Sequence, residues 1–162
     1  MIVCDKTMDF RMEDRVQRAV DYFKEGYNCS QSVFMAYADL FDLNPELAKA
    51  IPTSLGGGMG RLREVCGAVS GMLLLVSMKY PVLKGDDKET KKKNYATVQQ
   101  LAETFSRKNG SIVCRELLQL DVKKQDPTPE DRTESYYKRR PCVEYVADAA
   151  RIIGEMLQKS DI

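Results

Sequence analysis

The sequence LGGGMGRLREVCGAVSG at residues 55–71 leads directly into MLLLVSM at residues 72–78. A glycine-rich loop with two arginines is followed here by a run that carries no charged residue between Glu64 and Lys79. This run is too short to span a bilayer, and it contains two glycines and two serines. We therefore expect a central buried helix at about residues 63–80, with the rest of a helical domain wrapped around it.

Apolar residues at helical spacing and helix-capping residues predict the other elements. Asn28 and Gln31 form the pattern of a capping box, and Asn44 before Pro45 is a typical helix start. The expected helices cover about residues 9–25, 29–43, 45–52, 63–80, 87–110, a short segment after Ser111, and 141–159. The buried stripe expected on the fifth of these helices consists of Tyr95, Val98, Leu101, Ala102 and Phe105.

No run alternates apolar and polar residues as a β-strand would. The sequence therefore predicts an all-α, single-domain bundle of six or seven helices over residues 1–162, a length sufficient for one core. Residues 1–8 are expected to form a loosely ordered tail. Residues 121–140 are polar and contain two prolines, which predicts a long loop.

Composition and charge exclude several classes of function. The 25 Lys and Arg residues nearly balance the 24 Asp and Glu residues, so the net charge of +1 gives no reason to expect a nucleic acid or an acidic membrane as a partner. The chain has no histidine, which excludes a His-dependent triad, His-ligated zinc and His-ligated haem within this chain. The first residues become charged at once and show no secretory pattern, so we expect a cytoplasmic protein with reduced thiols.

Four of the five cysteines fall in the first turns of expected helices. These are Cys29, Cys66, Cys114 and Cys142. Unpaired backbone N–H groups and the helix dipole stabilise an anion at such a position, so we expect each thiol to have a pKa below its ordinary value of about 8.5. Basic neighbours are expected to act in the same direction: Arg61 and Arg63 beside Cys66, and Arg139 and Arg140 beside Cys142. The alternative is that these cysteines are buried packing residues.

The glycines near Cys66 allow two interpretations. Gly67 and Gly71 share a helix face, which favours either close helix packing or room around the Cys66 sulfur. The preceding glycine loop is neither a Walker loop nor Gly-x-Gly-x-x-Gly, because Arg63 stands in the place of the third glycine, and we expect no nucleotide. If a cofactor is present, the residues expected to line its site are Gly58, Gly60, Arg61 and Gly67.

The order of these motifs resembles that of the C_GCAxxG_C_C family. The matching features are Asn28-Cys29-Ser30-Gln31, the glycine loop, Cys66-Gly67-Ala68-x-x-Gly71, and single cysteines at 114 and 142. The resemblance covers about residues 12–158 and implies redox activity that depends on the four shared cysteines. Cys4 lies outside the pattern, and the lack of Cys-x-x-Cys-His and of any histidine gives no support for haem.

Three functions remain open from the sequence. The first is an iron–sulfur or other thiolate-bound metal centre for electron transfer, with Cys29, Cys66, Cys114 and Cys142 as ligands. The second is thiol–disulfide chemistry with Cys66 as the attacking thiolate. The third is a helical binding or assembly module with structural cysteines. The sequence does not identify a redox partner protein or small redox substrate. The apolar central helix also suggests a homodimer.

Overall fold

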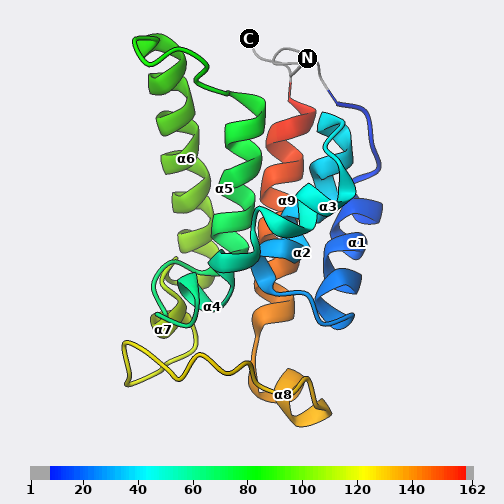
Figure 1. The fold of residues 1–162 in the computed structure, drawn as a ribbon, viewed down its shortest axis with the longest axis vertical. Helices are drawn as coiled ribbons and strands as arrows, with labels where there is room; N and C mark the ends of the chain where they lie inside the picture. The colour runs from blue at the N-terminus through cyan, green and yellow to red at the C-terminus, as the bar shows by residue number, and fades with distance from the viewer. Residues whose placement is uncertain (1–7, 160–162) are drawn as a thin grey trace.

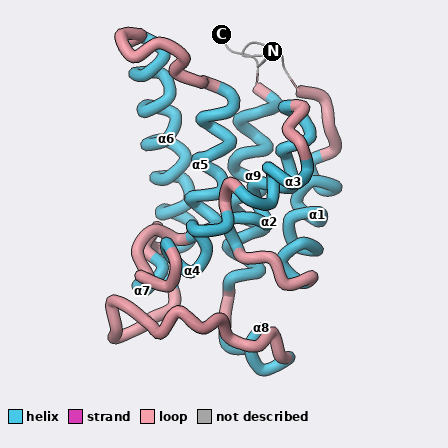
Figure 2. Tube along the Cα trace, in the orientation of Figure 1, coloured by secondary structure: helices cyan, strands magenta, loops and turns pink. Residues whose placement is uncertain are grey.

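The computed structural model describes residues 8–159, which form a bundle of helices (Figure 1). Its longer helices are α1 (Met12–Lys24), α2 (Cys29–Ala38), α5 (Gly67–Lys79), α6 (Lys88–Asn109) and α9 (Cys142–Gln158). Its shorter elements are η1 (Asp39–Phe41), α3 (Pro45–Ala50), η2 (Thr53–Leu55), α4 (Gly56–Met59), α7 (Cys114–Leu117) and α8 (Glu134–Arg139). Helices and loops account for all of this region in Figure 2, apart from an isolated bridge between Val65 and Val113. The prediction of an all-α domain is confirmed.

Local sequence explains where several helices begin. Asn28 and Gln31 form the expected capping box at the start of α2, in which each side chain bonds the backbone of the other residue. The side chain of Asn44 accepts hydrogen bonds at the start of α3, and Asp87 does the same for Thr90 in α6. No helix within residues 8–159 is both long enough and apolar enough to cross a membrane.

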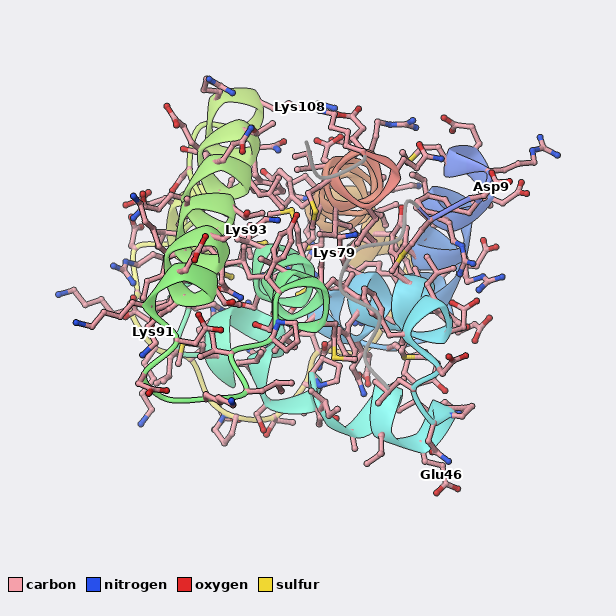
Figure 3. All side chains as sticks on the ribbon, turned by 90° about the horizontal axis from the view of Figure 1, so that it is seen from above. Asp9, Glu46, Lys79, Lys91, Lys93 and Lys108 are labelled. Atoms are coloured by element: carbon pink, nitrogen blue, oxygen red, sulfur yellow. The ribbon has the colours of Figure 1, made fainter. Side chains whose placement is uncertain are left out.

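Helix α5 is the central element of the core, as the apolar run predicts. It packs against α2, α6 and α9. The side chains of Val69, Met72, Leu75 and Val76 are completely buried. The view from above shows Lys79, at the end of α5, near the middle of the bundle, whereas Glu46 and Lys108 lie at its edge (Figure 3). Burial of most of its surface explains why α5 carries no charged residue before Lys79, and its exposed position is the polar Ser77.

The segment before α5 is not helical, contrary to the prediction. We expected the central helix to begin near residue 63, but it begins at Gly67, and Cys66 is its N-cap. Arg61 and Arg63 have positive φ angles of 66° and 59°. The backbone of residues 63–66 bonds instead to residues 112–115, and these long-range bonds replace the local bonds of a helix.

A further difference comes from side-chain packing on α6. Tyr95 was expected in the buried stripe of α6 but is 59% exposed. Asn94 is buried in that region and donates to the Tyr80 carbonyl, because a polar side chain that leaves water needs a hydrogen-bond partner.

The expected loop at 121–140 contains the short helix α8. Thr133 caps this helix, because its side chain accepts a hydrogen bond from the backbone N–H of Tyr136. The expected tail at residues 1–8 falls almost wholly outside the described residues.

The contact between α5 and α2 at Gly71 gives a stability prediction. A Cβ at Gly71 would lie 2.5 Å from the Ser30 carbonyl oxygen, whereas a Cβ at the exposed Gly85 would meet nothing within 4 Å. We expect Gly71→Ala to lower the free energy of unfolding by about 1–3 kcal/mol, because the overlap outweighs the helix propensity of alanine. Urea unfolding should show a change of less than about 0.5 kcal/mol for the control Gly85→Ala. Equal effects of the two variants would contradict this account of the α2–α5 contact.

Candidate functional site

The structure brings the four predicted cysteines to one end of the bundle. Cys29 is the first residue of α2, Cys66 caps α5, Cys114 is the first residue of α7, and Cys142 is the first residue of α9. All four line one cavity of about 60 Å³, the inner cavity. This is the lower end of the molecule in Figure 1, near α4 and α7. Cys4 is outside the described residues.

Backbone pairing joins the segments that carry Cys66 and Cys114. The Cys66 N–H donates to the Ile112 carbonyl at 2.8 Å, and the Cys114 N–H donates to the Glu64 carbonyl at 2.6 Å. The Tyr145 hydroxyl donates to the Leu117 carbonyl at 3.2 Å, which ties α9 to α7. The positions of three of the four cysteines therefore depend on bonds between segments far apart in the sequence.

Two glycines leave the space that cysteine side chains occupy. A Cβ at Gly67 would lie 2.3 Å from the Cys29 Sγ atom, and a Cβ at Gly58 would lie 2.7 Å from the Cys114 Cβ atom. Gly58 also has a φ of 67°, a backbone conformation that residues with a side chain rarely adopt. Gly67 thus leaves room for a sulfur atom and also allows close helix packing. The sulfur atom is that of Cys29, whereas we expected that of Cys66.

Backbone N–H groups near two of the sulfur atoms favour their thiolates. Those of Gly57 and Ser30 lower the pKa of Cys29. Those of Ala68 and Val69, in the first turn of α5, lower the pKa of Cys66, although the Cys66 side chain accepts no capping hydrogen bond. The direction of these effects is the one that the placement at helix starts predicts.

Burial nevertheless outweighs these effects, so the lowered pKa expected for Cys29, Cys66 and Cys142 is wrong in direction. Burial is the largest effect on Cys29 and raises its pKa. Burial, together with the neighbouring Cys29, raises the pKa of Cys66 well above its ordinary value. It raises the pKa of Cys142 to about 12. The protonated thiol is therefore the favoured state of these three cysteines when no cation lies among them.

The basic residues are arranged differently from the prediction. The Arg63 guanidinium lies 3.6 Å from the Cys114 Sγ atom, whereas we expected it to act on Cys66. Arg61 donates instead to the Asp126 carbonyl and to Gln125. Arg140 does lower the pKa of Cys142, though by less than burial raises it. Arg139 is exposed, and its side chain donates to the Ser135 carbonyl on its own helix.

A second, outer cavity of about 420 Å³ adjoins the inner one. Of the residues expected around a cofactor, Gly67 lines the inner cavity, Gly60 and Arg61 line the outer cavity, and Gly58 is buried against Cys114. The sequence did not reveal Arg132, which reaches both cavities from the segment expected to be a loop. Thr133 could have indicated the start of α8, but no local pattern marks Arg132.

The four cysteines are free thiols in the structure. Among residues 8–159, no three Cys, His, Asp or Glu side chains are arranged as ligands of one metal ion. Side-chain rotation would therefore have to bring the sulfur atoms together around a metal.

Four thiols from separate helix starts around one cavity define a cysteine-centred site in an all-α protein. The chain matches the family "Putative redox-active protein (C_GCAxxG_C_C)" over residues 27–156, and it belongs to that family. An uncharacterized protein of Archaeoglobus fulgidus is 25% identical over 147 residues, which cover 86% of this chain and 91% of that protein. No solved structure matches the chain.

The raised pKa of Cys142 predicts how stability changes with pH. The unfolded thiol loses its proton near its ordinary pKa of about 8.5, whereas the folded thiol keeps its proton up to about 12. The contribution of this group to stability is thus complete below pH 8.5 and is lost as the pH rises toward 12. Between about pH 8.5 and 10 the loss approaches about 1.4 kcal/mol per pH unit.

This prediction can be tested by urea unfolding of the reduced, metal-free protein at several pH values. Cys142→Ser should give a shallower fall in stability between about pH 8.5 and 10, because serine does not ionise there. A variant with the same slope as the wild type would contradict the raised pKa.

Proposed function

We propose that Cys29, Cys66, Cys114 and Cys142 bind an iron–sulfur cluster or another thiolate-bound metal, and that the protein transfers electrons. The observation that carries this proposal is the convergence of the four cysteines on one buried cavity from four helix starts. Four cysteine thiolates are a common ligand set for iron–sulfur clusters and for structural zinc. An iron–sulfur cluster, when bound, supplies one-electron redox chemistry.

The surroundings of the sulfur atoms suit such a group. Metal binding requires thiolates and releases the protons that burial retains on Cys29, Cys66 and Cys142. Backbone N–H groups already lie near Cys29 and Cys66, where they favour the thiolates, and hydrogen bonds from such groups tune the reduction potential of a cluster. The missing side chain at Gly67 leaves Cys29 unobstructed on that side.

Charge balance gives a further argument. Arg63 is only 4% exposed, and an arginine side chain carries a positive charge. Its described side-chain partners are the Gln125 amide oxygen and the Cys114 thiol, neither of which is a carboxylate. A buried cation needs a nearby negative charge. Thiolate ligands would provide that charge beside Arg63.

The proposal predicts stoichiometric metal in protein purified without oxygen. For an iron–sulfur cluster, we expect visible absorption, together with iron and acid-labile sulfide at a fixed ratio to the chain. Replacing any one of the four cysteines by serine should lower the metal content strongly, because a ligand is lost. Cys4→Ser is the matched control and should keep the wild-type content.

Metal analysis also covers zinc and other thiophilic metals, and redox titration separates them from an iron–sulfur cluster. A colourless protein that is free of stoichiometric metal would overturn the proposal. If a variant lacking all four cysteines folded and behaved as the wild type, the binding-module alternative would replace it.

The Arg63–Cys114 contact favours a second candidate, a thiol–disulfide cycle. In this cycle the Cys114 thiolate attacks an external disulfide, which leaves a mixed disulfide and releases one thiol. A neighbouring cysteine of the chain then displaces the second thiol, so two protein thiols are oxidised as one external disulfide is reduced. Cys66 is a poorer attacking group than the sequence suggested, because burial raises its pKa well above the ordinary value.

This candidate predicts that glutathione disulfide converts two protein thiols into one internal disulfide. Thiol titration before and after oxidation should show a loss of two thiols, and mass spectrometry should identify the pair. Cys114→Ser should slow the reaction by about tenfold or more, since the thiolate is the attacking species. An unchanged thiol count in the wild type would exclude the cycle, and Cys4→Ser serves again as the control.

A further inference from the structure

The outer cavity adjoins the cysteine site through shared walls. The residues that line both cavities are Asn28, Gly57, Arg63, Arg132, Tyr136 and Arg140. At about 420 Å³ the outer cavity is the size of a small-molecule site, whereas the inner cavity is much smaller. A small molecule held in the outer cavity would therefore lie next to the four cysteines.

The walls of the outer cavity are strongly basic. One acidic residue, Glu130, lines it together with four arginines, which we call the arginine cluster: Arg61, Arg63, Arg132 and Arg140. The chain as a whole has a net charge of only +1, so this concentration of positive charge is local. Arginine presents a planar set of donors that matches carboxylate and phosphate groups.

The arginines are held in place by the protein rather than free in solvent. Arg132 donates to the Phe23 and Tyr27 carbonyls at 3.2 Å each. Its guanidinium also lies 4.3 Å from the centre of the Phe23 ring and 4.9 Å from that of Tyr136. Within the described part of the chain, no carboxylate pairs with Arg132 or with Arg63. Two fixed cations thus face the cavities without an anionic partner.

Glu130 already occupies part of this arginine cluster. Its carboxylate bonds Arg140 and lies 3.8 Å from the nearest Arg61 nitrogen. A carboxylate of the chain therefore fits against two of the four arginines. Glu130 belongs to the polar segment before α8, so it could be displaced without moving the main bundle helices.

From this arrangement we propose that the outer cavity binds a small polyvalent anion, carrying phosphate-like or carboxylate groups, against Arg61, Arg63, Arg132 and Arg140. Glu130 competes with that anion for Arg61 and Arg140. The inference goes beyond the proposed metal centre and does not depend on it, because the arginine cluster consists of the chain's own side chains. A metal-free protein would keep the anion site.

Calorimetric titration of the protein as purified tests the proposal, with inorganic phosphate and malonate as probes and chloride as the control for ionic strength. We expect saturable binding that weakens with added salt. Arg132→Gln should weaken binding by about tenfold or more, because it removes charge-assisted hydrogen bonds. Glu130→Gln should strengthen binding, and Arg139→Gln, on the outer side of α8, should leave it unchanged.

A second measurement locates the bound anion. Bound phosphate should slow alkylation of Cys29 and Cys142, the two partly exposed thiols, in the reduced protein. If Arg132→Gln proves unstable in thermal unfolding, Arg61→Gln replaces it and should weaken binding in the same way. Absence of saturable binding of both probes, or binding unaffected by the arginine variants, would overturn the proposal. The metal analysis above is independent of this outcome.

Discussion

The contact between the N-terminal ends of α2 and α5 is the constraint on which the rest of the site depends. At Gly67 the backbone of α5 lies so close to α2 that a Cβ would overlap the Cys29 sulfur, and at Gly71 it would overlap the Ser30 carbonyl oxygen. No other residue type allows this approach without displacing a neighbour. The approach places Cys66 beside Cys29 at the end of the central helix, and the backbone pairing of residues 63–66 with 112–115 adds Cys114.

The site consequently has two regions that differ in charge: neutral thiols line the inner cavity, and arginines line the outer cavity. In the inner cavity, burial keeps the protons on Cys29, Cys66 and Cys142, although nearby backbone N–H groups lower the pKa of Cys29 and Cys66. In the outer cavity, fixed arginines outnumber the acidic residues of the walls. Arg63 stands between the two regions, buried and in contact with Cys114. A negative charge at the cysteines would stabilise this cation, and this physical link connects the sulfur chemistry to the basic walls.

The segment between α7 and α9 contributes more than a connection. It supplies Glu130 and Arg132, and α8 supplies Tyr136, to walls that also contain the glycine loop. Arg132 bonds two carbonyls near the end of α1, which fixes a polar segment against the bundle. Membership of the C_GCAxxG_C_C family accounts for the four cysteines and the Cys-Gly-Ala-x-x-Gly motif, whereas the arginine-lined cavity is a feature of this chain's tertiary structure.

The sequence by itself determined the all-α class, the main helices and the placement of four cysteines at helix starts, because caps and apolar periodicity act over a few residues. It could not determine that residues 63–66 leave the helix, that Asn94 rather than Tyr95 is buried, or that Arg63 faces Cys114, since each depends on partners distant in the chain. The direction of the thiol pKa values was likewise decided by the tertiary structure. Helix starts favour thiolates locally, but desolvation by the assembled core is the larger effect.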